Sequence, residues 1–69
     1  MFWLCEEMNA VVELTEAGFM RFNKESGDFT TPLTPSEIDT FCNGSIKSLS
    51  ASAALAFEDS KASKSAKAL

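Results

Sequence analysis

The sequence lacks histidine and tyrosine, and it contains only two cysteines, Cys5 and Cys42, far apart in the chain. Most catalytic chemistry in small domains uses a histidine base, a cysteine beside a histidine, or a cluster of soft metal ligands. None of these combinations can be assembled here. The composition therefore argues against an enzyme, and we expect no metal ion or other cofactor.

Two cysteines are also too few for a disulfide-rich scaffold of the secreted type. A single Cys5–Cys42 bridge would close a long loop. Two free thiols, buried as small hydrophobic groups, are the favoured interpretation.

Signals for export or membrane insertion are missing as well. The apolar residues 1–5 are too short for a secretory signal, no basic region precedes them, and Glu6 and Glu7 follow directly. No run approaches the roughly 20 apolar residues of a membrane span. We expect a cytoplasmic protein without a membrane partner, located in the host-cell cytoplasm or the virion if it is viral.

Charge is divided unevenly along the chain. Residues 1–44 hold eight of the ten acidic residues, whereas four of the six basic residues lie in residues 45–69. The first part should repel phosphate backbones, and the second has no arginine and no aromatic residue except Phe57. This distribution argues against nucleic-acid binding. Glu6, Glu7, Glu13 and Glu16 could instead form an acidic stripe on one helix, a candidate protein-facing surface.

A chain of 69 residues forms at most one domain. Such a chain buries about 60% of its unfolded surface and has a stability of about 3–10 kcal/mol. It has little room for both a core and a ligand pocket of about 300 Å³ or more. Binding a macromolecule through its surface is the more natural use.

Residues 3–17 allow two readings. Their apolar positions recur at three- and four-residue spacings, which favours a helix that ends at Gly18. The alternative is a strand over residues 10–15, because Val11 and Val12 are β-branched.

The next segment predicts a β-hairpin. Residues 19–22 are the best strand candidate, residues 29–31 are a second one, and the intervening residues 23–28 are rich in turn formers. Gly27 would supply the positive φ angle of the turn. A strand over residues 10–15 would extend this hairpin to a three-stranded meander.

A short helix after the hairpin has the sharpest local signal. Thr34 is a good N-cap, Pro35 suits the first helical position, and Glu37 completes a capping box. We expect this helix to turn Ile38 and Phe41 toward the core and to end near residues 43–44.

The last part of the chain predicts a longer helix. Apolar side chains recur at helical spacing from Ile46 to Phe57. Residues 60–69 are rich in Ala, Ser and Lys, and are expected to be an extension of this helix beyond a compact domain of residues 1–59. Candidate tail contacts are Lys61, Lys64 and Lys67.

Together these patterns predict a small α+β domain. A central hairpin, or three-stranded meander, is packed by the short capped helix and by the longer C-terminal helix. A mainly helical architecture is the alternative.

Two groups of side chains are candidates for partner binding. The aromatic pair at residues 2–3 is hard to bury in a small domain, and tryptophan is enriched among interface hot spots. A strand edge at residues 29–31, or the exposed side of residues 19–22, offers a second route by strand addition. The candidate partner-binding residues are Phe2, Trp3, Glu6, Glu7, Glu13 and Glu16.

The sequence therefore predicts a non-enzymatic protein-binding module that regulates or inhibits a larger macromolecular partner. In size and acidity it is comparable to small inhibitors encoded by viruses. The alternative is a structural subunit that self-associates or joins an assembly such as a virion, where neighbouring molecules order its C-terminal tail.

Overall fold

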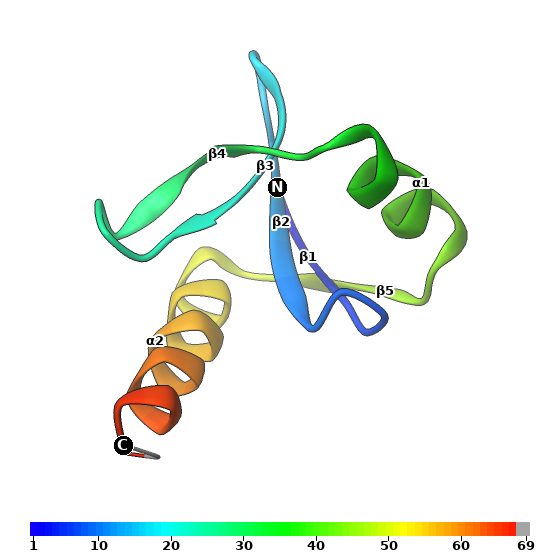
Figure 1. The fold of residues 1–69 in the computed structure, drawn as a ribbon. Helices are drawn as coiled ribbons and strands as arrows, with labels where there is room; N and C mark the ends of the chain where they lie inside the picture. Colours follow the sequence, from blue (N-terminus) through cyan, green and yellow to red (C-terminus); the bar gives the residue numbers. More distant parts are fainter. Residues whose placement is uncertain (68–69) are drawn as a thin grey trace.

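A computed structural model describes the backbone of residues 1–67 and the side chains of residues 1–61. This part of the chain forms one antiparallel sheet with strand order β4-β3-β2-β1-β5, together with two helices (Figure 1). The elements in chain order are β1 (Phe2–Cys5), β2 (Ala10–Thr15), β3 (Gly18–Asn23), β4 (Asp28–Pro32), α1 (Pro35–Asn43), β5 (Ile46–Leu49) and α2 (Ala51–Lys67). The prediction of an α+β fold with a central hairpin is confirmed.

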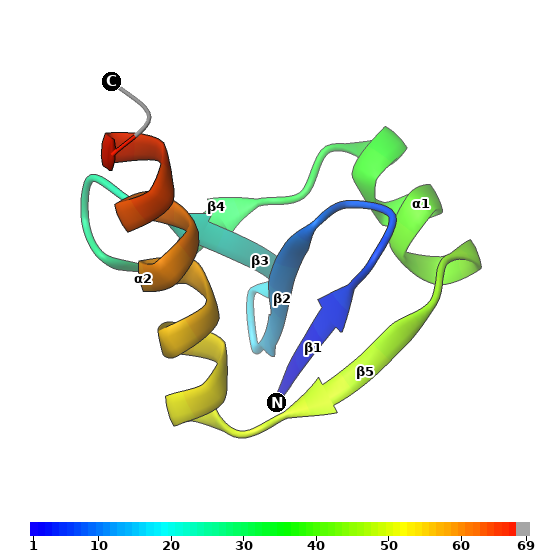
Figure 2. The same ribbon diagram turned by 90° about the horizontal axis from the view of Figure 1, so that it is seen from below.

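The two helices cover opposite faces of the sheet (Figures 1 and 2). Neighbouring side chains of a strand point to opposite faces. In β1, Trp3 and Cys5 accordingly join the core beneath α1, whereas Phe2 and Leu4 join the core beneath α2. The molecule thus has three layers, which we call the α1 layer, the sheet and the α2 layer.

The α1 layer is built around one aromatic side chain. Phe41 is buried, and its ring centroid lies 5.2 Å from that of Phe19 and 6.1 Å from that of Trp3. Cys5, Val12 and Leu33 complete this core. Such tilted and edge-on aromatic contacts stabilise a core beyond the area that they bury.

The α2 layer brings a helix of small residues against the sheet. Ala54 is fully buried with Val11 and Phe29. The Phe29 ring also meets Phe2 at 5.1 Å and Phe22 at 5.2 Å between centroids. Because Ala54 has only a methyl group, the helix can approach the strands closely.

The predicted capping box of α1 is present. Thr34 Oγ1 accepts a hydrogen bond from the Glu37 N–H at 3.2 Å, and Glu37 Oε1 accepts one from the Thr34 N–H at 2.9 Å. The helix ends at Asn43, as expected, and Phe41 is buried. Ile38 is 39% exposed, so the expectation that it faces the core is wrong. The hairpin of β3 and β4 is also confirmed, with Gly27 at a φ of +75° in its turn.

The helix predicted over residues 3–17 is wrong, and the strand alternative for residues 10–15 is right. Val11 and Val12 are both fully buried, one in each layer, and only a strand between two layers buries adjacent residues in this way. Gly18, with φ at +115°, lies at the β2–β3 turn and does not cap a helix.

The start predicted for the last helix is also wrong. Residues 46–49 form β5, which pairs with β1, and α2 begins only at Ala51. Ser50 caps the helix: its Oγ accepts from the Ala53 N–H at 3.2 Å. The backbone of α2 continues past residue 59 to Lys67, while the predicted domain boundary at residue 59 stays a prediction.

The two cysteines are both free, as favoured. Cys5 is buried beneath α1, but Cys42 is exposed, so the expectation that both thiols are buried is wrong for Cys42. Residue 42 directly follows the buried Phe41, and adjacent residues of a helix point about 100° apart, which carries Cys42 away from the sheet.

Candidate protein-binding edge

The predicted aromatic anchor lies in β1, inside the sheet. Phe2 and Trp3 are half-buried, and they point into the α2 and α1 layers respectively. Their neighbours are core aromatic rings, which accounts for both side chains as packing groups. A role in partner binding stays a prediction.

The four predicted carboxylates do not form one stripe. Glu6 and Glu7 lie in the β1–β2 turn, Glu13 lies within β2, and Glu16 lies in the β2–β3 turn. The stripe required a helix over these residues, and β2 instead separates the two turns by its whole length.

Glu7 has a structural task at the end of α1. Its Oε1 accepts a hydrogen bond from the Ser45 N–H at 2.7 Å, and this bond lowers the pKa of the Glu7 carboxyl. Gly44 allows the approach, because a Cβ there would lie 2.5 Å from Glu7 Oε1 and 2.7 Å from the Thr40 carbonyl oxygen. Glu7 thereby ties the β1–β2 turn to the connection between α1 and β5.

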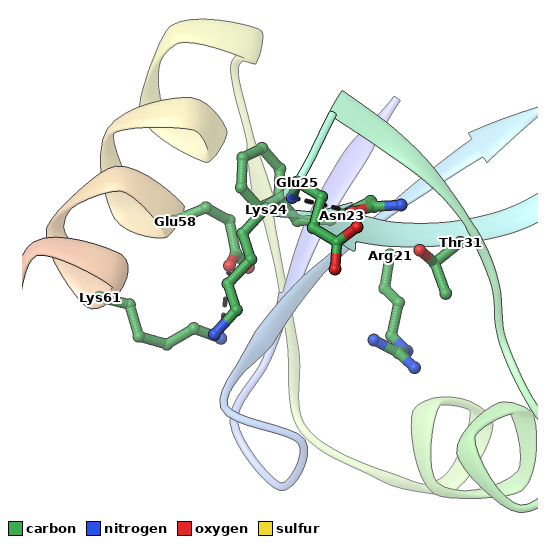
Figure 3. Close-up of a pocket in the computed structure, with 8 residues that line it drawn as sticks. Arg21, Asn23, Lys24, Glu25, Thr31, Glu58 and Lys61 are labelled. Carbon is green, nitrogen blue, oxygen red and sulfur yellow. Dashed lines mark hydrogen bonds and ion pairs between the residues drawn. The ribbon is translucent and has the colours of Figure 1, made fainter. Parts of the chain in front are cut away.

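A groove of about 490 Å³ separates the β3–β4 hairpin from α2 (Figure 3). Its lining residues are Arg21, Phe22, Asn23, Lys24, Glu25, Thr31, Glu58 and Lys61. In Figure 3 Arg21 points away from the two lysines, and its guanidinium pairs with the Glu37 carboxylate of α1 at 3.0 Å. The groove itself therefore holds side chains of both charges.

The buried group of this groove is the carboxylate of Glu58, which is only 4% exposed. Glu58 Oε2 accepts the Val11 N–H at 2.9 Å, and Glu58 Oε1 pairs with Lys61 Nζ at 3.3 Å. Lys61 Nζ also donates to the Asn9 carbonyl at 2.7 Å. Glu58 and Lys61 thus fasten α2 to the start of β2.

The pairing of β2 explains why the Val11 N–H bonds to Glu58. Leu14 N–H donates to the Met1 carbonyl, so every second residue of β2 bonds to β1, and Val11 directs its N–H toward β3. Pairing with β3 stops at Val12 and Arg21. A buried N–H without a partner is costly, and the Glu58 carboxylate supplies the missing acceptor.

The groove offers no evident reactive group. Within the described residues, no buried polar side-chain atom lacks a hydrogen-bond partner. No three side chains that could ligate a metal ion come together in that same part of the chain. Of the predicted tail contacts, Lys61 is used inside the molecule, and the side chains of Lys64 and Lys67 lie outside the described residues.

The two edges of the sheet differ in their protection. β4 forms one edge of the sheet. Leu33 directly follows β4, and its N–H donates inward to the Phe19 carbonyl at 3.3 Å. The alternation along an antiparallel strand then turns Pro32 outward. Proline has no N–H to offer an incoming strand, so this edge is partly blocked.

β5 forms the other edge and has no proline. The Glu6 N–H donates to the Ser45 carbonyl at 3.0 Å, so every second residue from Ser45 bonds to β1. Ile46 and Ser48 therefore direct their N–H and C=O groups away from the sheet. In Figure 2 β5 runs along the outer side of the molecule, between the last turn of α1 and the first turn of α2.

The side chains of this edge are accessible. Ile46 is 49% exposed, and Lys47 and Ser48 are exposed as well. Ile46 lies opposite Cys5 on the α1 side of the sheet, whereas Lys47 lies opposite Leu4 on the α2 side. We call Ile46–Leu49, with its outward backbone groups, the β5 edge.

Strand addition is predicted from the sequence at residues 29–31 or 19–22, not at β5. The edge at residues 29–31 exists as β4, but residues 19–22 belong to β3, which is flanked on both sides. The signal for β5 was weak: Ile46 is β-branched, but the sequence Ile-Lys-Ser-Leu does not alternate between apolar and polar residues. Nothing in the sequence pointed to Glu58.

No protein-family model, curated protein or solved structure matches this chain. Across the described residues, no helix combines the length and the apolar character needed to cross a bilayer. The site must therefore be interpreted from its own chemistry.

Proposed function

We propose that this chain is a non-enzymatic protein-binding module that regulates or inhibits a larger partner by adding a strand to its β5 edge. The observation that carries the proposal is the contrast between the sheet edges. Pro32 partly blocks β4, whereas Ile46 and Ser48 of β5 present outward backbone groups to solvent. A sheet edge with unpaired backbone groups is a natural template for another strand.

The energetics demand more than backbone pairing. Each hydrogen bond contributes about 0.5–1.5 kcal/mol net, whereas association costs about 4–15 kcal/mol in lost freedom. A short edge cannot cover this cost with its backbone groups alone. The exposed side chains of Ile46 and Lys47 must add contacts, and a partner segment that is already extended binds best.

The proposal includes a site of action in the cytoplasm. A small acidic module of this kind suits the regulation of larger machinery, and a viral origin would place it in the host-cell cytoplasm.

A capture experiment tests this function. Tagged protein is incubated with cell lysate and photo-crosslinked, and bound proteins are identified by mass spectrometry. Ser48→Pro removes an outward N–H without removing a bond to β1, and it should abolish capture. Ser48→Ala keeps the N–H and should retain capture. A partner held equally by both variants, or no stoichiometric partner at all, would overturn the proposal.

The second candidate is a structural subunit of a larger assembly, with its C-terminal tail ordered by neighbouring molecules. Exposed apolar side chains on several elements favour it. These side chains are Met1, Leu14, Ile38, Ile46 and Leu55. Light scattering at increasing concentration should then show assembly that depends on residues 62–69, whose deletion leaves Lys61 in place. A monomer at every concentration would contradict it.

A further inference from the structure

We propose that the β5 edge takes an extended, antiparallel protein segment that carries a carboxylate opposite Lys47. This inference rests on the proposed function and adds the chemistry of the partner. It follows from the position of Lys47 among the outward groups, from its surroundings, and from what a second copy of the chain would bring to the same edge.

The position of Lys47 favours a close charge pair. An antiparallel segment at this edge exchanges hydrogen bonds with Ile46 and Ser48, which leaves Lys47 in a non-hydrogen-bonded pair with the incoming strand. In such pairs the Cα atoms lie about 4.5 Å apart, compared with about 5.5 Å in hydrogen-bonded pairs. Opposite charges placed directly across two strands stabilise the pairing, and like charges destabilise it.

The surroundings of Lys47 leave its charge available. Its neighbour across the ladder is Leu4, and Leu4 in turn pairs with Val11, so the row beside Lys47 on the α2 side is apolar. Among the described residues, the ion pairs are Arg21–Glu37 and Lys61–Glu58, and Lys47 takes part in neither. It is also the only charged side chain of β5.

A second copy of this chain fits the edge poorly. Antiparallel pairing that engages both Ile46 and Ser48 sets Ile46 opposite Ser48 of the other copy, and therefore Lys47 opposite Lys47. Like charges would meet at the closest position of the ladder. Shifting the pairing by two residues leaves either Ile46 or Ser48 of each copy without its bonds. The lysine thus acts against self-pairing, a known protection of edge strands.

The side chains of Ile46 and Ser48 define which residues should flank the carboxylate in the partner segment. Ile46 and Ser48 both point to the α1 side of the sheet. An antiparallel segment reaches Ser48 first, then Lys47, then Ile46. The preferred partner sequence is therefore a small polar residue, then an acidic residue, then an apolar β-branched residue, as in Thr-Glu-Val.

Synthetic peptides test the inference directly. The probe is a fluorescent heptapeptide with Thr-Glu-Val at its centre, and its twin carries Thr-Lys-Val. The intact protein should bind the glutamate peptide about tenfold more tightly than the lysine peptide. Lys47→Glu should reverse this order. Lys24→Glu, an equal charge change in the exposed β3–β4 turn, should leave the order unchanged.

The possible results separate the two proposals. Equal affinity for both peptides, or a reversal by Lys24→Glu as large as that by Lys47→Glu, overturns the pairing with Lys47. If neither peptide binds while Ser48→Pro still abolishes lysate capture, the acidic segment is wrong and the proposed function stands. If the glutamate peptide binds but Ser48→Pro leaves capture intact, the peptide result stands without the proposed function.

Discussion

The two helices of this protein are held to the same sheet by different means. The shorter helix, α1, inserts the large Phe41 ring between Phe19 and Trp3, and a capping box closes its first turn. The longer helix, α2, buries Ala54 and the Glu58 carboxylate. The shorter helix thus relies on a large aromatic ring, and the longer one on a methyl group and a carboxylate.

The difference also concerns distance along the chain. The capping contacts of α1 join residues three positions apart. The polar contacts of α2 reach much farther: Glu58 bonds the Val11 N–H across 47 positions, and Lys61 bonds the Asn9 carbonyl across 52. The hydrogen bonds that close the first turn of α1 thus come from nearby residues, whereas the buried polar contacts of α2 need the finished sheet.

The largest expected effect comes from the aromatic centre of the α1 layer. Phe41→Ala should cost about 3–5 kcal/mol, which is comparable to the whole stability of about 3–10 kcal/mol. Urea unfolding followed by circular dichroism measures this loss. Phe41→Leu, which keeps most of the volume, should retain a cooperative transition. A loss below about 1 kcal/mol for the alanine variant would show that Phe41 is not the centre of this layer.

Removing the buried polar group of the α2 layer should cost less free energy of unfolding. Glu58→Ala removes the acceptor of the Val11 N–H and should cost about 1–3 kcal/mol. Glu58→Gln keeps an acceptor oxygen and should cost less. Hydrogen exchange adds a local readout, because the Val11 amide should exchange faster in the alanine variant. Equal exchange in both variants would contradict the role of Glu58.

The caps of the two helices provide a finer comparison. Thr34→Ala should cost about 1 kcal/mol, because it removes one half of the reciprocal bond with Glu37. Ser50→Ala removes a single cap bond of α2 and should cost less. The matched controls are Thr34→Ser and Ser50→Thr, which keep a hydroxyl oxygen. A larger loss for Ser50→Ala, measured by the same denaturation, would reverse this ranking.

The smallest effect is a dependence on pH. The pKa of Glu37 is lowered, first by the hydrogen bond from the Thr34 backbone and then by Arg21. A lowered folded-state pKa contributes stability above the ordinary value of 4.5, and this contribution is lost as the pH falls through the folded-state pKa. Because the Glu37 side chain stays partly exposed and solvent screens its charge, the loss should be small.

Glu37→Gln tests this dependence, because glutamine can still complete a capping box but carries no charge. The variant should lose less stability than the wild type between about pH 6 and pH 3. Parallel slopes for the two proteins would show that Glu37 does not contribute to the acid sensitivity. Glu7, whose pKa is also lowered, stays in both proteins and contributes equally.

Features that depend on nearby residues could be predicted from the sequence, whereas those that join distant residues could not. The start of α1 was predictable because Thr34, Pro35 and Glu37 act on one another within a single turn. Gly27 likewise identified the hairpin turn. The spacing of Val11 and Val12 suited a helix as well as a strand, and the pairing of β2 with two neighbours decided between them.

The candidate site was less predictable than the fold. A strand lies at the edge of a sheet when it has a paired neighbour on one side only. The local sequence of residues 46–49 does not carry that information. Strand addition was anticipated as a mode of binding, but for β3 and β4. Phe2 and Trp3 pack against the two cores, and their role in partner binding stays a prediction.

By itself, the sequence determined the α+β fold class, the capped helix and the hairpin, because these depend on composition and on contacts within a few residues. Only the tertiary structure decided that residues 46–49 become an edge strand, that Glu58 meets the Val11 N–H, and that Lys47 lies among outward backbone groups. These features join residues distant in the chain, and burial and hydrogen bonding can specify them only once β1 and β2 are in place.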